Sequence, residues 1–400
     1  MSERPGEHEG VIVVKIAVIH SRYRSAQPSG ENVAVQAQIE NLQAAGNEVF
    51  VYQKESDNIR ESAHGLITTG LRVARNAGSN PDTWINEVDP DIVHVHNTFP
   101  NISTDFLDRC RVPLVATLHN FRHSCAAGTF YSDGQLCTEC IDRGPSRAIA
   151  KRCYRNSRLA TLPMAVGPSR GALRSKLVAK ADRLVTMSGR AREMHIHAGI
   201  SADSLALIPN FRPDSSARAT FSRGKWIYIG RLSPEKGILD LAREWPEGHR
   251  LEIYGDGPLW GSIAAINNPD VHLNAPVPAE RVDDLLQSAT GVVFPSTWPE
   301  SAFPMSYLDA LCVGLPVLAR RGNSAADDVE ESGSGATFEN SSDIHQAMAQ
   351  IEVNWTSYAT NSRVSYESKF TPQLWISAIE ELYSEVIEGY GSKSGRPVTM

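Results

Sequence analysis

Short apolar runs alternate with longer amphipathic segments along almost the whole chain. The amphipathic segments, such as Asn32–Ala45 and Gly171–Asp182, carry apolar residues at helical spacing. The apolar runs have the length of buried β-strands. In the first half of the chain these runs are Val11–Ile19, Glu48–Tyr52, Ile92–Val95, Leu114–Leu118 and Arg183–Met187. Strands that alternate with helices form a parallel sheet that is covered by helices on both faces.

The same alternation starts again after Asn210. The second series of expected strands is Trp226–Ile229, Leu251–Tyr254, Val292–Phe294 and Pro316–Ala319. The expected helices of this half are Pro258–Ile266, Arg281–Ser288, Tyr307–Val313 and a last strong helix at Pro372–Ile387. Two such series predict an α/β fold with two doubly wound, Rossmann-like parallel-sheet domains that face each other across a cleft.

These patterns divide the chain into two domains, a linker and a final helix. The linker is rich in Pro, Ser and Arg, and the final helix is expected to pack back towards the first domain. The expected boundaries are 11–209 for the first domain, 210–223 for the linker, 224–371 for the second domain and 372–390 for the helix. The two chain ends, 1–10 and 391–400, are expected to be disordered tails.

Composition and the N-terminal sequence narrow the class of protein. Apolar residues make up 41% and charged residues 21% of the 400 residues, which is typical of globular proteins. No stretch approaches the about 20 apolar residues that a membrane-spanning helix needs. The N-terminal sequence MSERPGEHEG is acidic and polar, whereas a signal peptide is basic and then apolar. We therefore expect a cytoplasmic protein.

The net charge of −7 conceals a basic segment on an otherwise acidic chain. Residues 141–190 contain twelve Lys or Arg and two Asp, so this segment carries +10 and the rest of the chain −17. A basic segment on an acidic protein usually has an anionic partner. Within it, Gly171–Asp182 has Leu173, Leu177 and Val178 on one side. We expect the segment to dock on an anionic membrane; the alternative is a surface helix whose apolar side packs inwards.

Candidate chemistry begins where the expected strand Trp226–Ile229 ends. The next eight residues, GRLSPEKG, place Arg231 and Lys236 on either side of a tight, Pro-containing turn. A planar guanidinium and a compact ammonium both suit a diphosphate, although an exposed loop with two solvated charges is the alternative. The following strand ends in GDGP, where Gly255 allows a ligand to approach the backbone closely. GDGP is also an ordinary turn.

Two carboxylates follow the expected strand Val292–Phe294. Glu300 lies in the loop after the strand, and Asp309 lies in the helix that begins nearby. Carboxylates near a helix start can bind sugar and ribose hydroxyls while the free N–H groups of the helix face phosphate. Carboxylates on helices usually lie exposed on the surface. The neighbouring Trp298 and Phe303 favour burial of these two.

Taken together, the motifs match a known family. GRLSPEKG, GDGP and E-x8-D-A-L-x-x-G-x-P-V occur in the order and spacing of family 4 retaining glycosyltransferases, and the chain resembles that family, whose fold is GT-B. The first half shares PSGENVAVQAQIENLQAAGNEVFVY, PDIVHVHN and TLHN; LIPNF at the domain junction and SKFTPQLWISAIEELY near the C-terminus also match. The resemblance spans residues 13–387, and the set of motifs is specific although no single one decides it.

The resemblance implies roles for individual residues. Arg231 and Lys236 would neutralise the donor diphosphate, Glu300 would lie near the donor sugar, and Asp309, where the family usually has Glu, would bind the ribose. The implied donor-binding set is Gly30, Arg231, Lys236, Gly255, Glu300, Ala302, Phe303, Pro304 and Asp309. The implied catalytic set is His119, Arg231, Lys236 and Glu300.

Three histidines lie on or just after expected strands. His94 and His96 share one face of a strand by alternation, and we interpret them as structural. His119 lies beyond the end of the strand Leu114–Leu118, on the side of a parallel sheet where ligands bind. The resembling family has a histidine there that faces the reacting centre, so we assign His119 to function.

The expected reaction is metal-independent. Asp89-Pro90-Asp91 resembles the Asp-x-Asp of metal-dependent transferases, but it precedes the strand Ile92–Val95, at the end of the sheet opposite to ligands. We expect retaining hexosyl transfer, without a catalytic cofactor, from a nucleoside-diphosphate sugar to an acceptor bound by the first domain. The acceptor would be a lipid-linked or polysaccharide precursor. The alternatives are a sugar-nucleotide epimerase of the same architecture and a nucleotide-sugar-binding protein without transfer activity.

The expected donor site also bears on the basic segment 141–190. A basic patch that accompanies a complete donor site favours a membrane over nucleic acid as the polyanion. We therefore expect no nucleic acid partner, and we expect peripheral binding to the inner face of the plasma membrane.

Four cysteines follow the strand that leads to His119, in the pattern C-x11-C-x2-C-x12-C. They are Cys125, Cys137, Cys140 and Cys153. A reducing compartment disfavours disulfides, and C-x2-C is a common start of a tetrahedral zinc site. The residues between them are mostly turn formers, so a structural zinc ion would stabilise a loop with little apolar content. A zinc site and four independent reduced thiols both fit the pattern.

Overall fold

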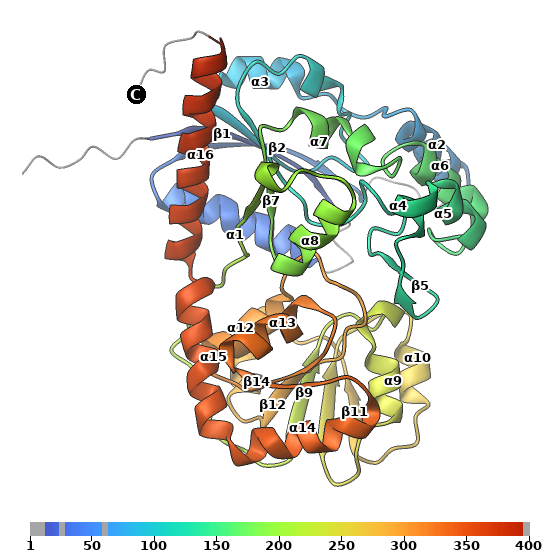
Figure 1. Cartoon of the computed structure of the whole chain (residues 1–400), viewed down its shortest axis with the longest axis vertical. Coiled ribbons are helices and arrows are strands. Elements are labelled where there is room, and N and C mark those ends of the chain that lie inside the picture. The colour runs from blue at the N-terminus through green and yellow to red at the C-terminus, as the bar shows by residue number, and fades with distance from the viewer. Residues whose placement is uncertain (1–12, 24–28, 58–62, 395–400) are drawn as a thin grey trace, which may run out of the picture.

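The computed structural model describes residues 13–23, 29–57 and 63–394, which form two α/β units (Figure 1). Each unit contains one six-stranded sheet whose paired strands are parallel. In spatial order, the first sheet consists of β2 (Glu48–Glu55), β1 (Lys15–Arg22), β3 (Ile92–Asn97), β4 (Leu114–Thr117), β7 (Arg183–Thr186) and β8 (Leu205–Leu207). The second consists of β11 (Val271–Asn274), β10 (Arg250–Tyr254), β9 (Lys225–Ile229), β12 (Gly291–Phe294), β13 (Val317–Arg320) and β14 (Gly335–Phe338).

The central strands are buried on both faces. In β1, Ile16 and Val18 belong to one hydrophobic cluster, whereas Ala17 and Ile19 belong to the cluster on the opposite face. A central strand of a parallel sheet is therefore apolar at consecutive positions, which is why it appears in the sequence as a continuous run.

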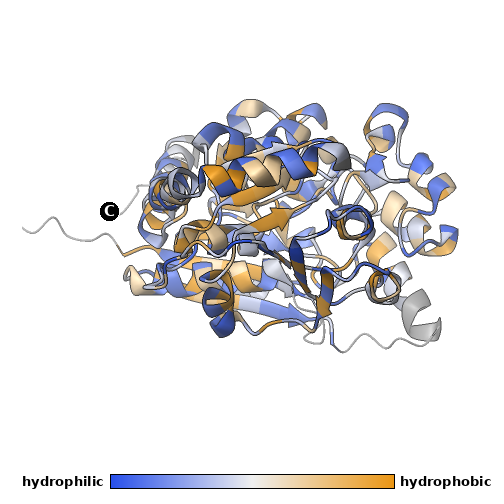
Figure 2. Ribbon diagram, turned by 90° about the horizontal axis from the view of Figure 1, so that it is seen from below, coloured by the Kyte–Doolittle hydropathy of each residue, from blue (hydrophilic) through white to orange (hydrophobic). Residues whose placement is uncertain are grey.

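Helices cover both sheets, and Figure 2 shows hydrophobic strands between helices of mixed colour. The helices of the first unit are α1 (Gly30–Ala44), α2 (Ala63–Ala74), α3 (Asp82–Val88), α4 (Glu139–Arg143), α5 (Ser146–Lys151), α6 (Arg158–Val166), α7 (Lys176–Lys180) and α8 (Gly189–His197). Those of the second are α9 (Ile238–Arg243), α10 (Trp260–Ala264), α11 (Val282–Leu286), α12 (Met305–Val313), α13 (Ser324–Ser332), α14 (Ser341–Val353) and α15 (Trp355–Lys369). A small hairpin, β5 (Tyr131–Ser132) and β6 (Gln135–Leu136), precedes α4.

The last helix, α16 (Pro372–Ser394), returns to the first sheet. Figure 1 shows it alongside the first unit, directly after α15 of the second. Its buried residues Trp375, Ile379 and Tyr383 belong to the same cluster as Ile16 of β1. The chain therefore crosses between the units twice, once after β8 and once before α16.

In each sheet the order of strands changes direction once. The change lies between β1 and β3 in the first sheet and between β9 and β12 in the second. The loops after two such strands diverge and leave a crevice at their carboxyl ends, which is where ligands bind in open parallel sheets. The predicted fold class, two doubly wound parallel-sheet domains, is confirmed.

Several predicted elements differ in detail. The predicted helix Gly171–Asp182 is split by Ser175, whose extended backbone and side chain cap the short α7. The last helix continues to Ser394, so the predicted tail 391–400 begins within a helix. The predicted tail 1–10 and residues 395–400 lie outside the described residues. No described helix is both long enough and apolar enough to cross a membrane.

Tyr383 provides a test of how α16 is held. Its hydroxyl lies 2.6 Å from Nδ1 of the buried His94 on β3. Replacing Tyr383→Phe leaves this nitrogen without its partner, so we expect the free energy of unfolding to fall by about 1–2 kcal/mol in urea denaturation. Tyr390→Phe, on the same helix but without a hydrogen bond among the described residues, is the matched control. Equal stabilities of the two variants would contradict this account.

Candidate active site

The loops after the carboxyl ends of the two sheets meet between the units. Met187, directly after β7, pairs with Ala302 in an isolated parallel β-bridge. Ser301 donates a hydrogen bond from Oγ to the backbone oxygen of His119 at 2.5 Å. These contacts bring the predicted His119 next to the loop that carries the predicted Glu300, although 182 residues separate Ser301 from His119.

The two predicted donor cations, Arg231 and Lys236, lie in the loop between β9 and α9 but in different surroundings. The Arg231 side chain is 63% exposed, and its Nη2 lies 2.5 Å from Oε1 of Glu235. The Lys236 side chain is only 20% exposed, and its Nζ lies 2.9 and 3.0 Å from the two carboxylate oxygens of Glu300. One cation is thus open to a ligand, and the other is neutralised inside the protein.

Glu300 is the most constrained of the predicted residues. It is buried, accepts a hydrogen bond from Ser296 Oγ, and has a positive φ of 55°. A non-glycine residue in this conformation costs on the order of 1 kcal/mol or more, and such strain gathers at functional sites. The ammonium of Lys236 also lies 5.3 Å from the ring centre of Trp298. Glu300 and Lys236 therefore form one rigid unit.

Asp309 on α12 is held by the linker. Arg212 forms ion pairs with both Asp309 and Asp283 of α11. Burial raises the pKa of Asp309 to about 6, and the charge of Arg212 opposes this rise. A ribose at this position would have to share or replace the contact with Arg212. Asp309 pairs with Arg212, whereas Lys236 and Glu300 pair with each other.

Three glycines explain the shape of the loops. Gly237 has φ 67°, and a Cβ there would lie 2.1 Å from the backbone oxygen of Pro295, so glycine is required where the basic loop turns. A Cβ on the predicted Gly255 would lie 1.9 Å from the backbone oxygen of Gly230. Gly255 is therefore required for the approach of two strand ends. A Cβ on the predicted Gly30 would meet nothing within 4 Å, so this glycine borders open space.

Ala302, Phe303 and Pro304 lead into α12. Pro304 directly precedes the helix, and Phe303 packs against Phe370, with ring centres 5.0 Å apart. The first N–H groups of a helix have no partner within it. The segment that we predict to contact sugar or phosphate therefore lies at the N-terminus of α12, where backbone N–H groups are free to donate.

The three predicted histidines, with His20, form a continuous buried row at the carboxyl edge of the first sheet. His94 and His96 stack with ring centres 4.2 Å apart, which shows that they share a face. Nδ1 of His96 lies 3.0 Å from Nε2 of His119. Burial lowers the pKa of His119 to about 3, and His20 and His94 add to this. His119 is therefore neutral at physiological pH, and it can exchange hydrogen bonds but cannot act as a permanent cation.

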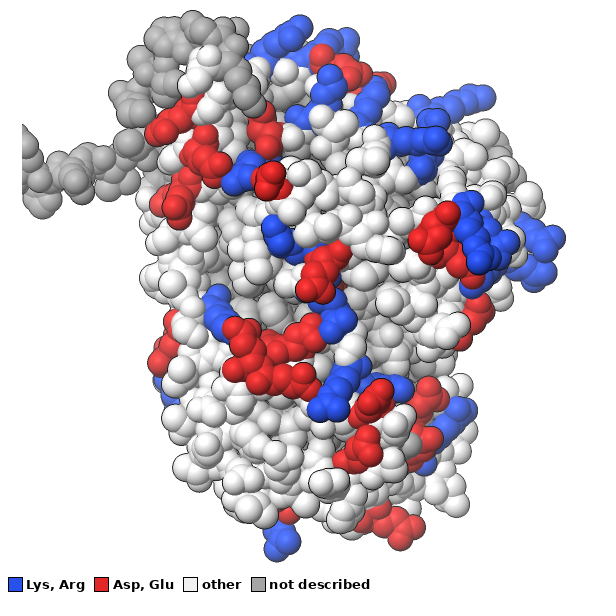
Figure 3. Space-filling model, in the orientation of Figure 1, with Lys and Arg blue, Asp and Glu red and all other residues white. Residues whose placement is uncertain are grey.

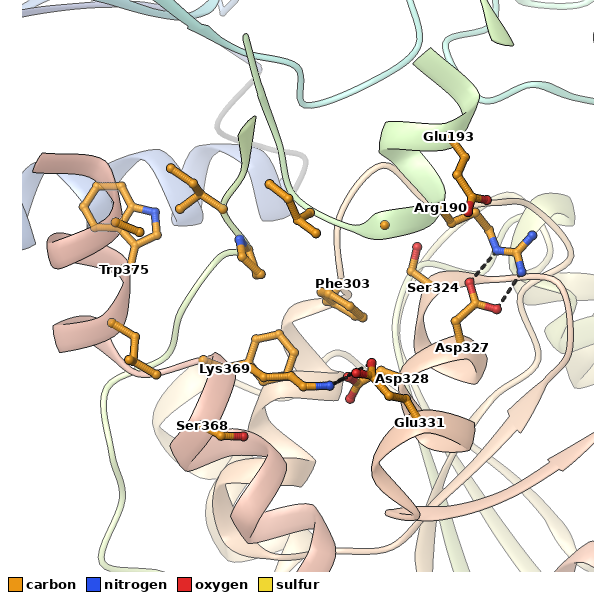
Figure 4. Close-up of a pocket in the computed structure, with 17 residues that line it drawn as sticks. Arg190, Glu193, Phe303, Ser324, Asp327, Asp328, Glu331, Ser368, Lys369 and Trp375 are labelled. Carbon is orange, nitrogen blue, oxygen red and sulfur yellow. Dashed lines mark hydrogen bonds and ion pairs between the residues drawn. The ribbon is translucent and has the colours of Figure 1, made fainter. Parts of the chain in front are cut away.

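A cavity of about 620 Å³ opens between α8, α13 and the junction of α15 with α16 (Figure 4). Arg190 binds both oxygens of Asp327 across it, at 2.6 and 2.7 Å, and Lys369 lies 2.7 Å from Asp328. Among the predicted donor residues, only Phe303 lines this cavity. The cavity is therefore adjacent to the predicted donor loop but distinct from it, and its basic residues are engaged by its own acidic residues.

The predicted zinc site is not seen as a preformed ligand cluster in the described part of the chain. The four cysteines of that site are Cys125, Cys137, Cys140 and Cys153, all of them free. Cys125 packs with Phe121, whereas Cys140 and Cys153 pack in another cluster with Met164. Within the described ranges, no group of three or more Cys, His, Asp or Glu residues could hold a metal ion. Burial, followed by the charges of neighbouring cysteines, raises the pKa of Cys140 to about 12 and that of Cys153 to about 11.

The sequence interpretation missed a second polar cluster in the first unit. Glu31, Tyr23, Asn97, Asn120 and Arg122 converge at the carboxyl edge of the first sheet. Tyr23 directly follows β1, Asn97 ends β3, Glu31 follows the predicted Gly30, and Asn120 and Arg122 lie in the loop after β4. No single motif marks them, because they come from three separate loops.

Two family models match the sequence. The model described as Glycosyltransferase Family 4 matches residues 28–214, and the model described as Glycosyl transferases group 1 matches residues 223–353. Together they cover most of both units. No individual curated protein matches the sequence.

Solved structures show the same fold at low sequence identity. A sucrose-phosphate synthase from Thermosynechococcus elongatus is 16% identical, with a TM-score of 0.66 over 94% of this chain and 99% of that one. The lipopolysaccharide outer core galactosyltransferase WaaB is 17% identical, with a TM-score of 0.57 over 92% and 99%. Anabaena Alr3699/HepE, solved with UDP, is 17% identical, with a TM-score of 0.55 over 92% and 100%. These likenesses support the GT-B fold.

The buried pair of Lys236 and Glu300 leads to a stability prediction. Lys236→Ala leaves a buried carboxylate without its cation, so we expect a loss of about 3 kcal/mol in the free energy of unfolding, measured by urea denaturation. Arg231→Ala, in the same loop but largely exposed, should change stability by less than about 0.5 kcal/mol. The double variant Lys236→Met with Glu300→Gln should recover part of the loss. If Lys236→Ala is as stable as Arg231→Ala, the pair is not structural.

Proposed function

Because the chain belongs to the family 4 glycosyltransferases, we propose that it transfers a hexosyl group, with retention, from a nucleoside-diphosphate sugar to an acceptor bound by the first unit. The observation that carries this proposal is the loop with Arg231 and Lys236, which lies against Glu300 close to the start of α12. Cations, a carboxylate and free helix N–H groups together suit a diphosphate linked to a sugar. We assign the donor to residues 224–371 and the acceptor to residues 11–209.

The proposed chemistry uses fixed charges. As the bond between the anomeric carbon and the diphosphate breaks, negative charge grows on the diphosphate, and Arg231 and Lys236 stabilise it. The acceptor oxygen attacks from the same face, and its proton passes to the departing phosphate oxygen. Metal-independent transfer agrees with the position of Asp91, whose carboxylate accepts a hydrogen bond from the Lys15 backbone at the amino end of β3, away from the cleft.

The related structures suggest which nucleotide sugar to test as the donor. Anabaena Alr3699/HepE was solved with UDP and with UDP-glucose, so UDP-glucose is the first donor to test. We propose a lipid-linked or polysaccharide precursor as the acceptor. Turnover of the donor by the purified protein separates a transferase from a binding protein without activity. An epimerase would convert the sugar of the donor into its epimer, whereas a transferase leaves the configuration of the remaining donor unchanged.

Arg231→Ala tests the donor site. Loss of a charge-assisted contact that strengthens in the transition state should lower kcat/KM by about a hundredfold, equivalent to about 3 kcal/mol. Turnover of UDP-glucose, or of the nucleotide sugar that screening identifies, is measured by mass spectrometry. Arg243→Ala, an exposed arginine on α9 that pairs with Asp240, is the matched control. A kcat/KM of Arg231→Ala close to that of the control would remove Arg231 from the site.

We also propose that the first unit docks on an anionic membrane, with α6 rather than residues 171–182 as the contact. Leu177 is buried and Val178 packs beside it, so these two residues face inwards, whereas Leu173 of that segment is exposed, at 71%. On α6, by contrast, Leu159, Leu162 and Val166 are 84%, 46% and 46% exposed. Their spacing places them along one face of the helix.

The basic residues of segment 141–190 fall into two groups. The residues that form ion pairs are Arg147, Lys151, Lys176, Lys180, Arg183 and Arg190. Those without an ion pair to any described residue are Arg143, Arg152, Arg155, Arg158, Arg170 and Arg174. Figure 3 shows Lys and Arg gathered on the side of the first unit where Figure 1 shows α4, α5 and α6. Unpaired arginines around an exposed apolar helix face suit the surface of an anionic bilayer.

Vesicle sedimentation tests this surface. Each basic residue near an anionic bilayer contributes about 1 kcal/mol, so replacing Arg152, Arg155 and Arg158 by Gln should weaken binding to phosphatidylglycerol-containing vesicles about a hundredfold. Replacing the ion-paired Lys176 by Gln should have a smaller effect. Binding that is equally strong on pure phosphatidylcholine, or that ignores salt, would contradict the proposal.

A further inference from the structure

A network of polar side chains surrounds Glu31 at the switch point of the first sheet. Glu31 lies in the first turn of α1, and Asn97 at the end of β3 donates to its Oε1 at 2.7 Å. Tyr23, just after β1, and Asn120, just after β4, also hydrogen-bond to the carboxylate. The carboxylate therefore collects donors from three strand ends at the place where an open parallel sheet binds ligands.

Arg122 completes this network and has donors to spare. Its guanidinium lies 4.2 Å from the ring centre of Phe99 and hydrogen-bonds to Tyr23. Its Nε and Nη1 are buried and have no hydrogen-bond partner among the described residues. Buried donors without a partner are rare, so these two nitrogens are available to a bound group or an ordered water.

Glu31 also has acceptor capacity beyond its contacts with the described residues. A carboxylate offers about four acceptor positions, and Glu31 uses three of them for Asn97, Tyr23 and Asn120. The neighbouring Gly30 borders open space. Asn120 directly follows His119, so the cluster is continuous with the histidine row at the same edge of the sheet.

The charges of the cluster select the kind of ligand. The carboxylate of Glu31 offsets the guanidinium of Arg122, so no net positive charge is left for a phosphate, and a phosphate would be repelled by Glu31. A sugar hydroxyl both donates and accepts, so it can donate to Glu31 and accept from Arg122. The two side chains are therefore suited to a neutral polyol.

We propose that Glu31 and Arg122 bind a hydroxyl pair of a neutral sugar ring, so that the acceptor is a glycan hydroxyl rather than a lipid phosphate. This inference rests on the proposed transferase function and defines its acceptor. Glu31 determines acceptor specificity, and it accepts a hydrogen bond from the sugar beside the position where the donor sugar is delivered.

The pH dependence of acceptor binding follows from the same cluster. Burial raises the pKa of Glu31 to about 7, while the donors around it and Arg122 oppose the rise. Protonation removes the acceptor position, so affinity for the sugar should fall as the pH drops below about 7. Tyr23, which also faces Glu31, stays neutral in this range because burial raises its pKa to about 12.

The test measures binding to the full-length protein in the presence of UDP, so that it does not depend on turnover. Saturation-transfer NMR is recorded with octyl glucoside, octyl galactoside and octyl N-acetylglucosaminide as neutral probes and with octyl phosphate as the anionic probe. We expect at least one glycoside to bind through its ring protons and octyl phosphate to bind more weakly. Glu31→Gln should lower glycoside affinity by about tenfold or more and abolish its pH dependence.

Controls separate this inference from the proposed function. Glu40→Gln makes the same change on an exposed part of α1 and should bind the glycoside as the wild type does. Affinity for UDP and for other nucleoside diphosphates, measured by calorimetry, reports the donor site alone: if the wild type binds none of them, the proposed function is in error, whatever the glycosides do. If Glu31→Gln fails to fold, Arg122→Met and the pH dependence of the wild type provide the same readout. Failure of every glycoside to bind, unchanged affinity in Glu31→Gln, or stronger binding of octyl phosphate would overturn the inference.

Discussion

The parallel pairing of both sheets constrains where chemistry can occur in this protein. When every strand runs in the same direction, all carboxyl ends lie along one edge and all returning helices lie on the faces. The two units turn these edges towards each other, and the bridge between Met187 and Ala302 joins them. Residues from loops far apart in the sequence therefore meet between the units, and residues on the faces serve packing. The histidine row, the basic loop and the cluster around Glu31 all lie at such edges.

Charges at these edges are balanced within the protein. Lys236 is held by Glu300, and Asp309 is held by Arg212. A buried charge without a partner is costly, so these pairs keep the protein stable without a ligand. They also mean that a charged donor has to exchange partners with the protein when it binds. Arg231, which is largely exposed, is the cation that can meet a diphosphate first, while Lys236 must be shared with Glu300.

The sequence predicts the fold better than the site. The strands are marked by residues that are close together in the sequence, whereas the site depends on contacts between residues that are far apart in the sequence. Continuous apolar runs such as Ile16–Ile19 in β1 identify central strands, since burial on both faces favours apolar residues at successive positions. The short edge strand β8, Leu205–Leu207, has too few residues for such a run and was missed. The motif GRLSPEKG identifies the loop that carries Arg231 and Lys236, and the motif E-x8-D identifies Glu300. The contact of Asp309 with Arg212 could not be predicted, because it depends on the path of the linker.

The cysteine-containing loop shows how contacts that are distant in the sequence can order a segment with little apolar content of its own. Its turn-forming residues were compatible with a structural zinc ion and with four independent reduced thiols. In the structure, Phe121 and Phe130 from this loop pack together, with ring centres 4.8 Å apart, and Trp298 of the second unit packs against their cluster. The hydroxyl of Tyr131 also donates to the backbone oxygen of Pro234 in the basic loop, at 3.3 Å. Because Trp298 also lies beside the ammonium of Lys236, aromatic packing between the units orders the loop and helps to fix the position of Lys236, the proposed donor cation.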